Sequence, residues 1–116
     1  MTTKCKITTH VLDISLGRPA QAIKVLLDFR GEEGWEEYAK GVTNEDGRLF
    51  DLIAPDKEID KGMYRLSFET AGYFSAQGMT GFYPYVAVVF EVNDPDEHYH
   101  VPLLLSPFGY STYRGS

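Results

Sequence analysis

The sequence predicts an all-β protein, a β-sandwich or barrel of about eight short strands. Apolar and polar residues alternate at a period of two along much of the chain, which is typical of strands with one buried face. Turn signals such as Asp46-Gly47 and Gly17-Arg18-Pro19 separate these stretches, because glycine accepts the positive φ angles of tight turns. With 116 residues, the chain has room for one domain, residues 1–116.

The expected strands follow one another along the whole chain. The clearest alternation covers residues 23–30, 64–69 and 86–92. Residues 86–92 are apolar on both faces, which predicts a strand at the centre of a sheet or at an interface. Weaker patterns predict the remaining strands, at 7–14, 35–42, 48–52, 98–105 and 110–115. Residues 71–78 lack the alternation and end in glycine, which favours a short helix or helical turn.

Charge and composition exclude several classes of partner. The formal net charge is -6 and the pI is about 4.9. An acidic chain without a basic cluster is a poor partner for nucleic acid or an anionic membrane, and no apolar run approaches the length of a membrane span. The single cysteine, Cys5, excludes an intrachain disulfide and is expected to be a free thiol in a reducing compartment. No secretory signal is predicted near the N-terminus, so a cytoplasmic location is expected.

The three histidines, His10, His98 and His100, are the first candidates for chemistry. Residues two apart on a strand point to the same face, so His98 and His100 are expected on one face. Together with His10 they would complete the three-histidine pattern that binds catalytic zinc. The alternative is structural, and it is favoured for His98 because Asp96 and Glu97 precede it at the start of a strand. His10 is either structural or a base near neutral pH.

Residues that suit substrate contacts form a second group. Arg48 follows the Asp46-Gly47 turn and is either a solvated strand residue or a planar cation that pairs with imide or carbonyl oxygens. Arg114 allows the same two interpretations, and Tyr113 either offers its hydroxyl or packs. The aromatic-rich stretch before Ser116 predicts a tail docked as a strand, which would fix the terminal carboxylate beside Tyr113 and Arg114. The sequence has no phosphate-binding loop and no nucleophile elbow.

Five motifs spread over residues 7–116 form a recognisable set. They are Thr8-Thr9-His10-Val11-Leu12-Asp13 with Gly17-Arg18-Pro19-Ala20; Thr43-Asn44-Glu45-Asp46-Gly47-Arg48; Phe82-Tyr83-Pro84-Tyr85-Val86; His98-Tyr99-His100-Val101-Pro102-Leu103-Leu104-Leu105-Ser106-Pro107; and Tyr113-Arg114-Gly115-Ser116. This set resembles the 5-hydroxyisourate hydrolases, the transthyretin-like enzymes of urate breakdown. The Tyr-Arg-Gly-Ser ending separates these hydrolases from transthyretin, the hormone carrier of the same fold.

The resemblance implies a two-sheet β-sandwich of eight strands with one short helix, assembled as a homotetramer, a dimer of dimers with active sites in the channel between dimers. It implies hydrolysis of 5-hydroxyisourate to 2-oxo-4-hydroxy-4-carboxy-5-ureidoimidazoline, with no metal or other cofactor. The sites that it implies are a catalytic set, His10, Arg48, His100 and Ser116, and a substrate-binding set, His10, Arg48, Tyr113 and Arg114.

The implied roles leave some alternatives open. Either His10 or His100 takes the proton of the attacking water, and Arg48 stabilises charge on the carbonyl. Tyr113 hydrogen-bonds the substrate ring, Arg114 either contacts the substrate or orients the tail, and the Ser116 carboxylate fixes a histidine tautomer. Three rival functions remain at this point: a transthyretin-like carrier, a zinc hydrolase built on the three histidines, and a structural β-sandwich module.

Overall fold

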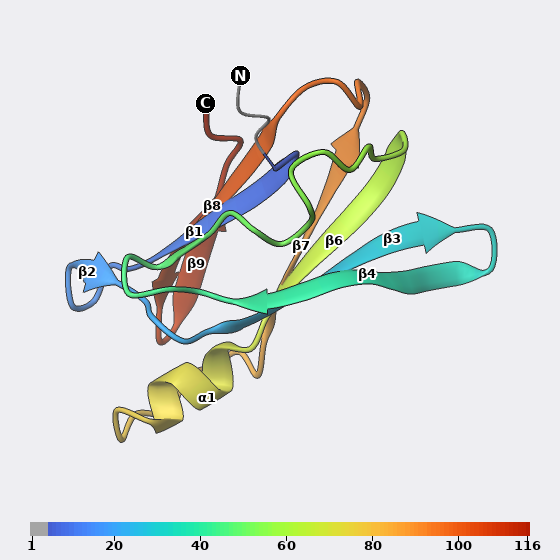
Figure 1. The fold of residues 1–116 in the computed structure, drawn as a ribbon. Helices are drawn as coiled ribbons and strands as arrows, with labels where there is room; N and C mark the ends of the chain where they lie inside the picture. Colours follow the sequence, from blue (N-terminus) through green and yellow to red (C-terminus); the bar gives the residue numbers. More distant parts are fainter. Residues whose placement is uncertain (1–4) are drawn as a thin grey trace.

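The computed structural model describes residues 5–116 and shows two β-sheets that face each other, with a short helix at one end (Figure 1). Residues 1–4, where the sequence predicts no secretory signal, lie outside the described residues. In chain order the elements are β1 (Ile7–Asp13), β2 (Arg18–Pro19), β3 (Lys24–Gly31), β4 (Gly34–Val42), β5 (Arg48–Leu49), β6 (Gly62–Phe68), α1 (Thr70–Ser75), β7 (Val86–Val92), β8 (Tyr99–Ser106) and β9 (Gly109–Thr112). The prediction of an all-β, two-sheet sandwich with one short helix is confirmed.

Strands from the two ends of the chain meet in the first sheet. Its order is β2-β1-β8-β9, and β5 also pairs with β1. β1 and β8 run parallel, with Thr8 opposite His100 and His10 opposite Pro102. β5 is antiparallel to β1 and places Arg48 opposite His10. The second sheet has the order β4-β3-β6-β7 and carries none of these residues.

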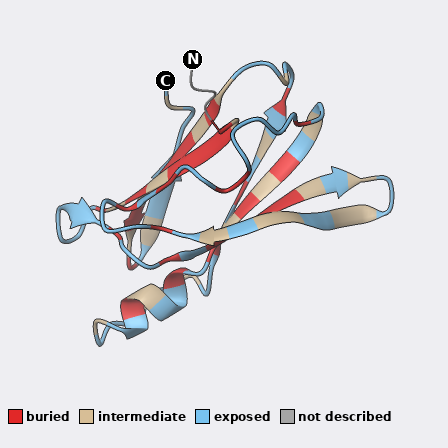
Figure 2. Cartoon of the chain, viewed as in Figure 1, coloured by how far each residue is buried: buried red, intermediate tan, exposed pale blue. Residues whose placement is uncertain are grey.

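The core lies between the two sheets. Ile7 and Val11 of β1 and Leu103 of β8 are fully buried, and they face Leu27 and Leu66 of the second sheet in one apolar cluster. Figure 2 shows buried and less buried residues alternating along β6. The period of two in the sequence therefore separates an inner face from an outer face.

The structure corrects two of the predicted positions for strands. β7 lies at the edge of its sheet and pairs only with β6 among the described strands, so the alternative of a central strand is wrong. The strand expected over 48–52 ends at Leu49, because the chain then leaves the sheet and places Leu52 and Ile53 in the core. The two-residue strand β2 was not expected, since Arg18 and Pro19 follow a glycine turn.

Two further boundaries differ. The helix covers Thr70–Ser75 instead of 71–78, and the chain then turns at Gly78, where φ is 71°. The last strand ends at Thr112, and beyond it a single bridge joins Gly115 to His100. The prediction of a strand over 110–115 is therefore wrong for residues 113–115. Within residues 5–116, α1 has six residues, and no helix of this part of the chain is long and apolar enough to cross a membrane.

Candidate active site

His10, Arg48 and His100 lie on one face of the first sheet. Along β1, Ile7, Thr9 and Val11 point into the core, so Thr8 and His10 point outward. The pairing of β1 with β8 and β5 then places His100 beside Thr8 and Arg48 beside His10. The structure thus gathers residues that are far apart in the sequence on the outer face of one sheet.

A pocket of about 440 Å³ opens on this face. Its lining residues are Cys5, Thr8, Thr9, Arg48, Phe50, Pro55, His98, His100 and Ser116. His10 is not part of this lining and lies beside Arg48. The volume falls in the range of small-molecule sites, and the lining combines a guanidinium with two imidazoles.

The Thr8 hydroxyl joins the two histidines of the pocket. Its Oγ1 lies 2.8 Å from Nδ1 of His100 and 2.9 Å from Nε2 of His98. The two imidazole rings are nearly parallel, at an interplanar angle of 21° and a centroid distance of 6.3 Å. The prediction that His98 and His100 share a face is confirmed. The partner of His100 Nδ1 in the described residues is Thr8, where the sequence suggested the Ser116 carboxylate for fixing a histidine tautomer.

The tail of the chain closes over His100. The Gly115 amide donates a 2.8 Å hydrogen bond to the His100 carbonyl. A Cβ atom at position 115 would lie 2.6 Å from Cδ2 of His100 and 3.3 Å from Cγ of Pro102. Only glycine fits this close approach without moving the ring or the tail.

Burial and positive neighbours favour the neutral form of both outward histidines. Burial lowers the pKa of His100, and electrostatic interactions with His98, Arg48 and His10 lower it further. Burial and the Arg48 charge also lower the pKa of His10, although a hydrogen bond with the Asp46 backbone partly opposes this shift. At neutral pH both imidazoles are therefore in the form that can accept a proton.

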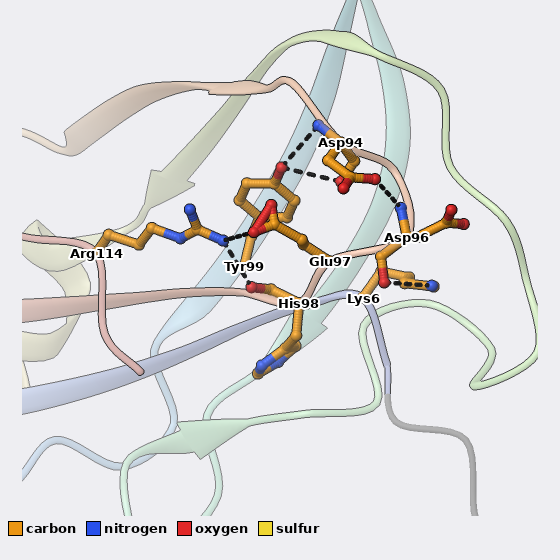
Figure 3. Close-up of polar contacts among 7 residues, drawn as sticks. All are labelled: Lys6, Asp94, Asp96, Glu97, His98, Tyr99 and Arg114. Carbon is orange, nitrogen blue, oxygen red and sulfur yellow. Dashed lines mark hydrogen bonds and ion pairs between the residues drawn. The ribbon is translucent and has the colours of Figure 1, made fainter.

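Arg114 lies on the other side of β8 from the histidine rings. Its Nη2 donates to the His98 carbonyl at 3.2 Å and lies 3.7 Å from Oε1 of Glu97. The guanidinium carbon lies 4.4 Å from the centroid of the Tyr99 ring. Figure 3 shows that the His98 imidazole points away from Arg114. Within one chain, Arg114 thus holds the backbone next to the pocket and does not line it.

Tyr113 is likewise outside the pocket of His100. It is 58% exposed and, with Arg114, lines a separate pocket of about 280 Å³ beside β7. A larger groove of about 730 Å³ lies on the second sheet, and its lining, which includes Lys24, Val42 and Tyr85, contains none of the predicted site residues. A single chain therefore brings together His10, Arg48, His100 and Ser116 but leaves Tyr113 and Arg114 apart from them.

Sequence reasoning did not single out Thr8. Its only signal was that it lies two residues before His10 and shares that face, and the link to His98 and His100 required the parallel pairing of β1 with β8. Among residues 5–116 no three or more histidine, cysteine, aspartate or glutamate side chains form a group that could hold a metal ion. The three-histidine metal site considered from the sequence is therefore not formed in this part of the chain.

Comparisons with known proteins show the family to which the chain belongs. The family model described as HIUase/Transthyretin family matches residues 7–115. The 5-hydroxyisourate hydrolase of Halalkalibacterium halodurans is 46% identical over 117 residues, covering 96% of this chain and 98% of that protein. The 5-hydroxyisourate hydrolase of Mus musculus is 45% identical over 112 residues, covering 95% of this chain and 94% of that protein.

Solved structures of a 5-hydroxyisourate hydrolase and of a transthyretin are similar to this chain. A Klebsiella pneumoniae 5-hydroxyisourate hydrolase has a TM-score of 0.83 at 37% identity, covering 95% of this chain and 98% of its own. A sea bream transthyretin in complex with thyroxine has a TM-score of 0.88 at 34% identity, covering 96% of this chain and 95% of its own. The family model and these similar sequences and structures show that the chain belongs to the HIUase/Transthyretin family.

Proposed function

We propose that this protein is an enzyme that hydrolyses 5-hydroxyisourate to 2-oxo-4-hydroxy-4-carboxy-5-ureidoimidazoline in urate breakdown. The observation that carries the proposal is the gathering of His10, Arg48 and His100 on one face that has a pocket. The proteins from Halalkalibacterium halodurans and Mus musculus, which are named for this activity, support it at 46% and 45% identity over nearly the whole chain.

The reaction requires three catalytic functions, and different residues of the site can provide them. Opening the ring hydrolyses an amide-type bond, which requires an activated water, a stabilised oxyanion and a proton for the leaving nitrogen. His10 or His100 takes the proton of the water, since both are neutral near pH 7. Arg48 pairs with the developing oxyanion through its planar guanidinium. Ser116 lines the same pocket, and its carboxylate stabilises a protonated histidine.

The proposal includes a homotetramer in which Tyr113 hydrogen-bonds the substrate in the site of a neighbouring subunit. Two features support association. The edge strands β7 and β9 each have one free side within the described sheets. Large aromatic side chains are exposed nearby, with Phe108 at 75% and Phe82 at 69%. Exposed apolar clusters of this kind mark contact surfaces. In the proposal Arg114 orients the tail that carries Tyr113.

Two further parts of the proposal concern the protein as a whole. Residues 1–116 act as one domain, as expected from the chain length. The protein works in the cytoplasm, which is supported by its single buried free thiol at Cys5.

The pH dependence of kcat/KM follows from the histidine environments. The pKa of both His10 and His100 is lowered from 6.5, so the basic form dominates at pH 7 and is lost only as pH falls through the shifted pKa. We expect kcat/KM to be constant around pH 7 and to fall at acidic pH with a midpoint below 6.5. Initial rates, corrected for spontaneous decay at each pH, measure the midpoint, and a value above 6.5 contradicts this account of the site.

The proposed function is tested by following freshly prepared 5-hydroxyisourate in the ultraviolet. Decay that is faster with the protein than without it, and that persists after exhaustive chelation, supports a metal-independent hydrolase. Decay at the spontaneous rate rejects the enzyme. In that case the second candidate, a carrier, gains support, because the sea bream transthyretin matches this fold with a TM-score of 0.88.

A further inference from the structure

We propose that the Thr8 hydroxyl holds His100 in the tautomer that acts as a base, and that His98 fixes the direction of that hydroxyl. Thr8 and His98 are positioning residues, because they act through His100. The assigned hydrogen-bond direction and the catalytic role rest on the proposed function, whereas the contacts of Thr8 with the two imidazoles do not. It also assigns the role of general base to His100 rather than to His10.

The contacts of Thr8 with two imidazoles limit where the hydrogens can lie. Thr8 Oγ1 contacts Nδ1 of His100 at 2.8 Å and Nε2 of His98 at 2.9 Å. A hydroxyl has one hydrogen, and a neutral imidazole has one N–H. If Thr8 donates to His98, it must accept from His100, so the His100 hydrogen lies on Nδ1. Nε2 of His100 then has a lone pair.

Catalysis selects this direction over the opposite one. If Thr8 donated to His100 Nδ1, the His100 hydrogen would lie on Nε2, and the ring would have no free lone pair for a proton from water. Hydrolysis starts with the removal of that proton. Only the tautomer with hydrogen on Nδ1 activates water, and an orienting partner on Nδ1 of a catalytic base has this effect in other hydrolases.

The surroundings keep the three groups in place. Thr8 is buried, so little water competes for its hydroxyl. From the other side of β8, Arg114 donates to the His98 carbonyl at 3.2 Å and thereby holds the His98 backbone, as Figure 3 shows. Gly115 lies against the His100 ring. Besides His98, the charged or titratable residues that act on His100 or line its pocket include His10, Arg48 and Cys5, and Ser116 lines the same pocket.

Nitrogen NMR of the imidazoles tests the hydrogen-bond part without any substrate. The chain has only three histidines, so the signals of 15N-labelled protein can be assigned with His10→Gln and His98→Gln variants. At a pH at which the rings are neutral, we expect the wild-type His100 to show the tautomer with hydrogen on Nδ1. The Thr8→Val variant should show a mixture. A wild-type His100 with hydrogen on Nε2, or identical spectra for wild type and Thr8→Val, overturns the inference.

Thr43→Val is a matched control for the loss of a threonine hydroxyl. Thr43 is buried outside the pocket, and its hydroxyl donates to the Ala20 carbonyl at 2.8 Å. We expect Thr8→Val to lower kcat by about 10- to 100-fold, as is typical when the hydrogen-bond partner of a functional histidine is lost. Thr43→Val should leave kcat within about threefold, and Thr8→Ser should restore most of the activity, because it keeps the hydroxyl.

The NMR and kinetic experiments together distinguish failure of the inference from failure of the proposed function. If the wild-type protein does not hydrolyse 5-hydroxyisourate, the proposed function fails, and the NMR spectra still decide whether Thr8 sets the tautomer. If the wild type is active and Thr8→Val has the same kcat and pH profile as Thr43→Val, the catalytic role of Thr8 is rejected. If Thr8→Val does not fold, the tautomer of the wild-type His100 decides the question.

Discussion

Replacing His100 with alanine is expected to lower kcat for 5-hydroxyisourate by at least about a hundredfold. The ring lines the pocket, its Nδ1 is held by Thr8, and its pKa is lowered by burial and by neighbouring positive charges. Removing it takes away the group that accepts the proton from water. The measurement is kcat from the loss of ultraviolet absorbance of fresh substrate, with the spontaneous rate subtracted.

Ser106→Ala provides the matched control for this variant. Ser106 lies on the same strand and the same face as His100, and its hydroxyl donates to the Gly109 carbonyl, away from the pocket. We expect this control to keep kcat within about threefold of wild type, since surface changes away from a site have small effects. If His100→Ala is as active as Ser106→Ala, His100 has no catalytic role.

Gly115→Ala is expected to lower kcat by about 10- to 100-fold without a comparable loss of stability. The new Cβ would lie 2.6 Å from Cδ2 of His100. The ring cannot retreat freely, because Nδ1 is hydrogen-bonded to Thr8, so either the imidazole or the tail with Ser116 must move. A displacement of about 1 Å at a catalytic group can cost a factor of about a hundred in rate. Kinetics and thermal unfolding of the same preparation measure the two effects.

Gly72→Ala is the control for the same change of residue. Gly72 lies in α1, and a Cβ there would meet no heavy atom within 4 Å. Alanine in a helix is favoured over glycine by roughly 0.5–1 kcal/mol, so this variant should be as active as wild type and slightly more stable. Equal kcat for Gly115→Ala and Gly72→Ala would show that the tail is not packed against a working His100.

The alternation of residue types predicted most of the strands but not how they are arranged. Residues 86–92 show the limit. Their apolar side chains on both faces suggested a central strand or an interface, and the structure places β7 at the edge of its sheet with Val89 54% exposed. The apolar pattern shows that both faces of this strand are suited to burial. It does not show whether another part of the same chain buries them. The interface alternative remains a prediction.

The candidate site was likewise only partly predictable from the sequence. The motifs pointed to His10, Arg48 and His100 through their resemblance to a hydrolase family, whereas residue type and local sequence alone left a structural alternative open for each of the three. They did not point to Thr8, and they suggested substrate contacts for Tyr113 and Arg114 that a single chain does not bring to the pocket. In the proposal, Tyr113 contacts the substrate in the site of a neighbouring subunit, whereas Arg114 orients the tail.

The sequence alone determined that this chain forms strands and which side chains can do chemistry, because backbone preferences and hydrophobic alternation act over a few residues. The tertiary structure alone decided that Thr8 bridges His98 and His100 and that Gly115 lies against His100. The first contact depends on the register between β1 and β8, which are far apart in the chain, and the second depends on how the chain runs back along β8 through β9. A slip of one residue between β1 and β8 would place Thr8 on the face opposite to His98 and His100.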